Sequence, residues 1–394
     1  MTRLLLAASL SVLALSAHAE VRPNALKLNE IQVLGTHNSY AQPVDKRLLA
    51  EVDPILEKLM PLMSRGLSEA DMARFREEHP HGLIFSEALN YDHPDLKAQL
   101  NAGLRSLELD VNADPVGGHY MDPAGYRLLR AKGVSDLAAH NTTGLERPGF
   151  KVLHVPDIDF RSHCPTLKLC LSQIREWSEA NPKHIPLFLL IEAKTQGLPI
   201  LPNPTAPVPF TPERFDELDR ELVEGLGRDR LITPDDVRGD FPTLNAAIKA
   251  GNWPTLEQSR GKIILLMITA TGPAATQAYL DGHPSLKGRA AFVRAEADQD
   301  HAAFLMYDNA IVRQAEIQAA VKAGYLVRTR SDIDTHEAKV NDPSRAKAAF
   351  ESGAQVVSTD YFQLPNPYGT PYVVSLPGGS EYRCTPVICT VEKP

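Results

Sequence analysis

The sequence predicts an α/β fold of the (β/α)8 type, a TIM barrel distorted by long loop insertions. Eight short apolar segments follow one another along the 394 residues, and segments with helical spacing separate most of them. The apolar segments lack the strict alternation of half-exposed strands, which is typical of parallel strands covered by helices. Eight such strand–helix units predict a barrel. An open doubly wound sheet is the alternative, but no G-x-G-x-x-G or P-loop motif supports it.

The predicted strands are the eight apolar segments themselves. They cover residues 30–36, 105–111, 151–155, 185–192, 262–268, 303–307, 325–329 and 355–359. Each is five to eight residues long and mostly apolar, which is the length and composition of a buried strand.

The predicted helices follow from helical spacing and from capping signals. They cover residues 44–65, 95–102, 167–180, 212 to 225 or 227, 243–250, 311–323 and 344–352. Pro54 and Pro61 are expected to break the first of them into pieces, because proline lacks the N–H that a helix interior requires. Thr211 caps the fourth helix, with a proline at its first position. Three helices are closed by a glycine: Gly103, Gly324 and Gly353.

Two long excursions and one proline-rich loop, at residues 41–93, 112–150 and 195–210, interrupt the regular pattern. The first excursion contains three histidines that we expect to be ordinary loop residues: His79, His81 and His93. The segment after residue 329 contains Asp332, Asp334 and His336, which we expect to form a capped polar loop and not a second ion site.

Composition indicates a soluble globular protein, with 43% apolar and 23% charged residues. The net charge is −8 and there is no basic block, so nucleic acid is not an expected partner. An anionic substrate would therefore need local positive charge or a metal ion. No obligate protein partner is evident from the sequence.

The first nineteen residues have the pattern of a cleaved export signal. Arg3 supplies the positive start, residues 4–15 the apolar middle, and residues 17–19 a small-x-small cleavage site. We therefore expect a secreted or periplasmic protein with a single domain over residues 20–394. The apolar run is too short for a permanent membrane span.

Export changes the interpretation of the four cysteines, which fall in two close pairs. In an oxidising compartment the simplest pairing is local, Cys164 with Cys170 and Cys384 with Cys389. Other pairings would cross-link the two regions. A zinc site is not favoured, because neither pair has the C-x-x-C spacing.

Polar side chains with catalytic potential recur where the predicted strands end, and a barrel places its active site there. His37 and Asn38 follow the first strand, and His154 ends the third. Glu108 and Asp110 are two residues apart, so their carboxylates share one face of the second strand. The further candidates are Glu192, Lys194, Lys262, Arg328, Arg330 and Asp360.

These residue types suit the cleavage of a phosphate diester. The candidates include four carboxylates and one amide, whose oxygens favour a hard divalent ion, calcium or magnesium. Two histidines can share the general base and general acid duties. A metal ion and nearby cations offset the charge that develops on phosphoryl oxygens.

Each candidate also has an ordinary structural interpretation. Glu192 and Lys194 could pair with each other, Arg328 could pair with an acid inside the barrel, and Lys262 could lie at the surface. Lys262 in particular opens a predicted strand instead of closing one. The functional interpretation is favoured because acids and histidines recur after consecutive apolar segments, where a charge is costly unless it is paired or used.

Taken together, the motifs resemble those of the secreted bacterial calcium-dependent phosphatidylinositol-specific phospholipase C family. The resemblance covers most of the chain after the signal segment. The segments that carry it are Gly35-Thr-His-Asn-Ser-Tyr40, Leu107-Glu-Leu-Asp110, Val152-Leu-His-Val-Pro-Asp-Ile-Asp159, Val327-Arg-Thr-Arg-Ser-Asp332, Asn341-Asp342 and Val357-Ser-Thr-Asp-Tyr361.

The resemblance implies a distorted TIM barrel that cleaves a phospholipid on the glycerol side of its phosphate and contacts the membrane surface transiently. It implies that Asn38, Glu108, Asp110 and Glu192 bind calcium. By the same analogy, His37 would help to deprotonate the inositol hydroxyl and His154 would protonate the leaving diacylglycerol oxygen. Two alternatives remain at this point: a glycerophosphodiester phosphodiesterase, and a non-catalytic barrel that binds a phosphorylated ligand.

Overall fold

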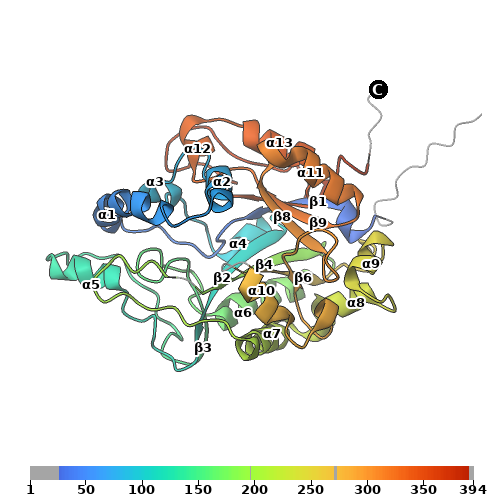
Figure 1. Ribbon diagram of the computed structural model, residues 1–394, viewed down its shortest axis with the longest axis horizontal. Coiled ribbons are helices and arrows are strands. Elements are labelled where there is room, and N and C mark those ends of the chain that lie inside the picture. The colour runs from blue at the N-terminus through green and yellow to red at the C-terminus, as the bar shows by residue number, and fades with distance from the viewer. Residues whose placement is uncertain (1–25, 196, 270–272, 390–394) are drawn as a thin grey trace, which may run out of the picture.

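A computed structural model describes residues 26–195, 197–269 and 273–389. The predicted export signal at residues 1–19 lies outside this described part. The chain forms the predicted TIM-barrel-like fold, with a curled, mainly parallel sheet surrounded by helices (Figure 1). No helix of the described residues has the length and apolarity needed to cross a membrane.

The sheet runs in the order β5-β6-β4-β2-β1-β10-β9-β8, and every neighbouring pair on this path is parallel. The strands are β1 (Ile31–Thr36), β2 (Ser106–Asp114), β4 (Leu187–Lys194), β5 (Leu231–Ile232), β6 (Ile263–Thr269), β8 (Phe304–Asn309), β9 (Leu326–Arg330) and β10 (Val356–Thr359). These bounds confirm seven of the eight predicted strands to within a few residues.

The third predicted strand, residues 151–155, is wrong as a barrel strand. The chain there forms β3 (Gly149–Val152), which pairs antiparallel with β2. Another short strand, β7 (Phe292–Val293), lies parallel to β6, and the next residue, Arg294, makes a single parallel bridge to Phe304 of β8. Among the described residues a single bridge therefore joins the two ends of the curled sheet, and this incomplete closure is the distortion of the barrel.

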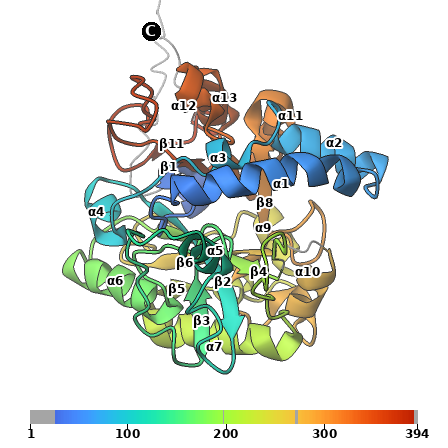
Figure 2. The same cartoon turned by 90° about the vertical axis from the view of Figure 1, so that its left-hand side faces the viewer.

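The described helices cover the outside of the sheet and the excursions. They are α1 (Lys46–Ser64), α2 (Glu69–Glu78), α3 (Phe85–Ala88), α4 (Leu96–Asn101), α5 (Ala124–Ala131), α6 (Leu167–Ala180), α7 (Pro212–Leu226), α8 (Pro234–Arg238), α9 (Leu244–Lys249), α10 (Pro273–Leu280), α11 (Ala310–Lys322), α12 (His336–Val340) and α13 (Ser344–Ser352). The excursions that follow β1 and β2 carry α1 and α5, which lie on the left in Figure 1 and in front of the strands in Figure 2.

The prediction that prolines break the first helix is also wrong. Helix α1 continues through both Pro54 and Pro61. Each proline is exposed, and so are Ala50 and Glu57, four residues earlier. The carbonyl groups that lose an N–H donor there can therefore be hydrated, which lowers the cost of keeping the helix continuous.

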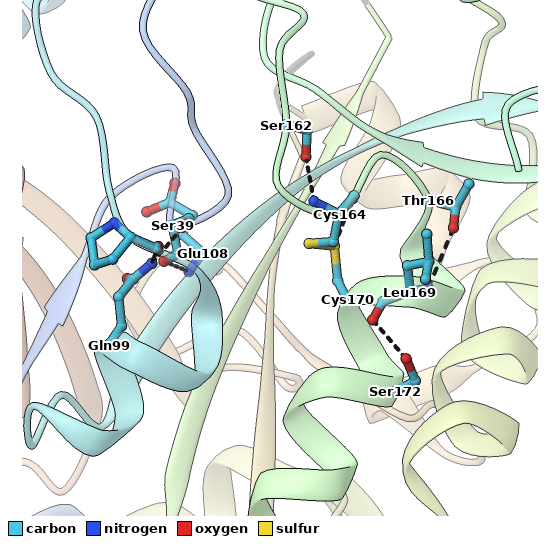
Figure 3. The surroundings of a disulfide bond; sticks show 10 residues. Ser39, Gln99, Glu108, Ser162, Cys164, Thr166, Leu169, Cys170 and Ser172 are labelled. Carbon is cyan, nitrogen blue, oxygen red and sulfur yellow. Dashed lines mark hydrogen bonds between the residues drawn. A yellow bond between two sulfur atoms is a disulfide. The ribbon is translucent and has the colours of Figure 1, made fainter. Parts of the chain in front are cut away.

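Both predicted local disulfides are present, between Cys164 and Cys170 and between Cys384 and Cys389. The first is buried beside the start of α6 (Figure 3). The second follows β11 (Arg383–Cys384), which pairs antiparallel with the beginning of β1. The last part of the described chain is thus attached to the amino end of the first strand.

Gly35 allows β1 and β2 to approach closely where they pair. A Cβ atom added there would lie 2.3 Å from the Cβ atom of Ser106 and 2.4 Å from its carbonyl oxygen. We expect Gly35→Ala to lower the free energy of unfolding by about 2–4 kcal/mol, because the obstructing atoms belong to a buried strand. Urea denaturation measures this loss.

Gly82→Ala is the control for this prediction. No atom lies within 4 Å of the added Cβ at that site, so only its positive φ opposes alanine, at a cost of about 1 kcal/mol. An equal loss of stability in both variants would contradict the close approach of β1 and β2.

Candidate functional site

Polar groups from five parallel strands meet at the carboxyl ends of the strands. The register sets Asp110 of β2 opposite Glu192 of β4, and Gly35 of β1 opposite Ser106 of β2, so that His37 and Asn38 follow at the same edge. Strands β9 and β10 lead to Arg330 at this edge and to Asp360 just beyond it.

Three carboxylates form the centre of the site: Glu108, Asp110 and Glu192 each offer an oxygen, and these oxygens lie within 4.8 Å of one another. Both oxygens of Asp110 are buried; Oδ2 lies 3.2 Å from the ammonium of Lys194, and Oδ1 has no hydrogen-bond partner among the described residues. Burial raises the pKa of Glu108 to about 8 and that of Asp110 to about 6. Burial acts in the same direction on Glu192, but the nearby charges of Lys194 and His154 lower its pKa overall.

This cluster fits a hard divalent cation. Its donors are all oxygens, and the buried Oδ1 of Asp110 still needs a partner, which calcium coordination would supply. Lys194 is the ion-pair partner of both Asp110 and Glu192, at 3.2 Å and 3.1 Å. One ammonium for two carboxylates leaves this pair with a net negative charge.

The segment after β1 is fixed directly against Glu108. The backbone N–H of Ser39 donates to the carbonyl oxygen of Glu108 at 3.0 Å, and the backbone N–H of Glu108 donates to the Ser39 hydroxyl at 2.8 Å (Figure 3). Gln99 of α4 donates to the carbonyl oxygen of Ser39 at 2.6 Å. Asn38 adopts a positive φ of 45°, its amide nitrogen donates to Tyr91 at 2.6 Å, and its amide oxygen accepts only a long hydrogen bond from Tyr40 at 3.5 Å.

His37 is held by an acid on one side of its ring. Its Nδ1 lies 3.0 Å from Asp360 and 3.4 Å from Arg330, and Arg330 donates to the other oxygen of Asp360 at 3.0 Å. Because a guanidinium has only donors, Nδ1 cannot serve both neighbours, and the shorter distance favours donation to Asp360. Burial and the positive charges of Arg330 and Arg328 hold the pKa of His37 well below its usual value.

His154 faces His37, with ring centroids 6.4 Å apart and an interplanar angle of 78°. Its Nδ1 lies 2.9 Å from the carboxylate of Asp159. Asp159 stands five residues later because a tight turn folds the chain back, with backbone bonds from His154 and Val155 to the carbonyl oxygen of Asp159. In both histidines, pairing at Nδ1 leaves Nε2 as the nitrogen for proton transfer.

The structure therefore brings together all but one of the site residues predicted from the sequence. The exception is Lys262, which precedes β6 at the opposite edge of the sheet and donates to the backbone oxygen of Asp229. It stands too far toward the amino end of its strand to reach the candidate site, so we exclude it from substrate binding. The structural interpretation of Arg328 also holds, because its guanidinium donates to the carboxylate of Glu108 inside the barrel at 3.1 Å.

Several residues contribute to the site although the sequence did not predict a role for them there. His93 was expected to be an ordinary loop residue, but it is buried and its Nε2 lies 2.8 Å from the carbonyl oxygen of His37. Asp332 accepts from the backbone N–H of Asp360 at 2.8 Å and from the hydroxyl of Thr359 at 2.6 Å, so it positions the acid that holds His37. Asp308 of β8 pairs with Arg328. No local pattern marks these contacts, because each joins segments far apart in the sequence.

Comparison with known protein families identifies the family of this chain. Residues 26–386 match the family described as phosphoinositide phospholipase C, Ca2+-dependent. Comparison with curated protein sequences gave no significant match.

Two solved structures are similar in fold. One is a calcium-dependent phosphoinositol-specific phospholipase C from Pseudomonas sp, with 14% identity, a TM-score of 0.50, and coverage of 92% of this chain and 96% of the other. The second is a Ca2+-dependent phosphatidylinositol-specific phospholipase C from Streptomyces antibioticus, with 17% identity, a TM-score of 0.51, and coverage of 88% and 98%. At these identities the likeness establishes the fold alone.

Proposed function

Because this chain belongs to the family of Ca2+-dependent phosphoinositide phospholipases C, we propose that it is a secreted phosphodiesterase that cleaves phosphatidylinositol by attack of the inositol's own hydroxyl on the phosphate. The products are diacylglycerol and a cyclic inositol phosphate. The observation that supports this proposal most directly is the pair of facing histidines, His37 and His154, each paired with a carboxylate beside the three-carboxylate cluster.

His37 is suited to the role of general base. Its lowered pKa keeps the imidazole neutral at pH 7, so Nε2 carries a lone pair that can accept the proton of the attacking inositol hydroxyl. Asp360 fixes the tautomer through Nδ1 and stabilises the imidazolium that forms.

His154 is suited to the role of general acid. Its Nδ1 pairs with Asp159, which fixes the ring and leaves Nε2 as the atom that would donate a proton to the leaving glycerol oxygen. The two ring centroids lie 6.4 Å apart, and we propose that the phosphate is bound between the two Nε2 atoms, as in-line displacement at phosphorus requires.

The side chains that would hold calcium are Asn38, Glu108, Asp110 and Glu192. Bound calcium would lower the pKa of the attacking hydroxyl and offset charge on the phosphate. Arg330 and Lys194 are the cations near the histidines and carboxylates, and we propose that they bind phosphoryl oxygens. Arg328 forms ion pairs with Glu108 and Asp308, and we propose that it holds Glu108 in position without contacting the substrate.

Secretion is part of the proposal and is supported by the two disulfides, which persist in oxidising compartments. Residues 1–19 would be the cleaved signal, as their composition predicts. Contact with a membrane surface would be transient and would involve the excursions around the carboxyl edge of the sheet.

The direct test is turnover of phosphatidylinositol by the purified mature protein, with calcium and then with excess chelator. We expect diacylglycerol and a cyclic inositol phosphate only with calcium, and recovery when calcium is restored. Cleavage of glycerophosphodiesters in place of the lipid would keep the site and change the substrate. Turnover of neither would overturn the catalytic role.

Calcium affinity should rise with pH. The raised pKa values mean that Glu108 and Asp110 carry protons in the metal-free protein near pH 6, and calcium must displace these protons. Between pH 6 and pH 8 we expect the calcium affinity to increase by about tenfold to a hundredfold. Each proton that calcium displaces can raise this affinity by up to about tenfold per pH unit. Calorimetry in two buffers of different ionisation enthalpy measures both affinity and the protons released. An affinity independent of pH, with no proton release, would contradict the raised pKa values.

A further inference from the structure

Lys194 occupies an unusual place among the candidate calcium ligands. It follows Glu192 by two residues on β4, so both side chains emerge on the same face of the strand. In the register with β2, Lys194 is opposite Asn112 while Glu192 is opposite Asp110. Its side chain nevertheless turns back, and its ammonium contacts Asp110 and Glu192 at 3.2 Å and 3.1 Å.

The same carboxylate oxygens cannot serve the ammonium and a calcium ion equally. Calcium–oxygen distances are about 2.3–2.6 Å, so the ion would lie within the space that the ammonium now approaches. Two cations on shared oxygens in a site where Asp110 is fully buried would repel each other strongly. Lysine has a long flexible stem and can withdraw its charge without moving the backbone.

We propose that Lys194 is an internal counter-ion that calcium displaces, and that the displaced ammonium then contacts the phosphate of the substrate. Without calcium, the ammonium compensates two carboxylates that would otherwise lie unpaired in the barrel. With calcium, the same charge becomes available to a phosphoryl oxygen. This inference rests on the proposed function for the identity of ion and substrate.

The first test measures calcium affinity by calorimetry at pH 8. Lys194→Met removes the competing charge and keeps most of the side-chain volume, so calcium should bind at least about tenfold more tightly than in the wild type. Lys194→Arg keeps a cation and should not gain affinity. Lys322→Met, at an exposed position in the last turn of α11, is the matched control and should behave as wild type. Equal or weaker binding in Lys194→Met would overturn the displacement.

The second test uses the wild-type protein, so it does not depend on the folding of a variant. An amine-reactive reagent followed by peptide mass spectrometry reports how accessible the Lys194 amine is, and its side chain is only 15% exposed. Saturating calcium should increase labelling of Lys194 and leave that of Lys322 unchanged. Unchanged or reduced labelling of Lys194 would overturn the displacement.

Turnover separates this role from a merely structural one. In Lys194→Met we expect tighter calcium binding together with a kcat at least about tenfold lower, whereas structural damage would weaken both. A wild-type kcat in this variant would overturn the phosphate contact.

The two proposals can fail separately. If Lys194→Met binds calcium more tightly but the wild-type protein does not cleave phosphatidylinositol, the counter-ion role of Lys194 is supported and the proposed function is contradicted. If the wild-type protein cleaves the lipid with calcium but Lys194→Met has an unchanged calcium affinity, the proposed function is supported and the counter-ion role of Lys194 is contradicted.

Discussion

Replacing His37 by alanine should lower kcat for phosphatidylinositol hydrolysis by about 10²–10⁴-fold, the usual contribution of a positioned general base. The expectation rests on its contact with Asp360, on the facing ring of His154 and on a pKa lowered by burial and by neighbouring cations. Steady-state kinetics with calcium in excess measures the loss. KM should change much less than kcat, because the imidazole acts in the chemical step.

His283→Ala is the matched control for this variant. His283 is a histidine of the described chain that precedes η4 (Pro284–Leu286) and contacts the carbonyl oxygen of Lys287. Its replacement should leave kcat within about twofold of wild type, as expected for a surface substitution. A His37→Ala protein with wild-type melting temperature and near wild-type kcat would remove His37 from the chemistry.

Replacing Asp110 by asparagine should abolish the stabilisation by calcium. At a calcium concentration about one hundred times Kd, ligand binding should stabilise the wild-type protein by about 2.7 kcal/mol, and this gain should be absent in the variant. Asparagine removes a charge from the centre of the carboxylate cluster and keeps its shape. Thermal melts with and without calcium measure the difference.

The fold should tolerate this change, because burial already raises the pKa of Asp110 to about 6 and makes its neutral form accessible. Asp240→Asn, at an exposed position, is the control and should retain the full calcium response. A calcium-induced shift of equal size in Asp110→Asn would show that the ion binds elsewhere. Loss of turnover should accompany loss of the shift.

The strand pattern could be predicted because burial acts on each segment locally. Parallel strands with helices outside are apolar throughout, and the runs at β4 and β6 show this directly in the sequence. Strand direction is not local in this way. The segment that contains β3 is only partly apolar, and β3 pairs antiparallel with β2. The two-residue β7 gives almost no signal in the sequence, although it lies where the ends of the sheet meet.

The candidate site was predictable to a similar degree. Glu108 and Asp110 could be recognised as candidates because they are two residues apart on one predicted strand. His37 and His154 could be recognised because they lie at the ends of predicted strands. The site was over-predicted at Lys262, because a lysine at a strand boundary looks the same at either end until the strand limits are exact. It was under-predicted at His93, whose burial depends on packing against the segment after β1.

The sequence by itself determined the kinds of chemistry available to this protein: the oxygen ligands, the two imidazoles, the barrel strands and the local disulfides. Spacing of two along a strand or five to six between cysteines is enough to encode these features. Only the tertiary structure decided which charge compensates which. The pairing of Lys194 with Asp110, of Asp332 with the backbone of Asp360, and of Asp159 with His154 depends on where side chains converge in space. Electrostatic energy depends on distance and burial, and neither can be read from separation along the chain.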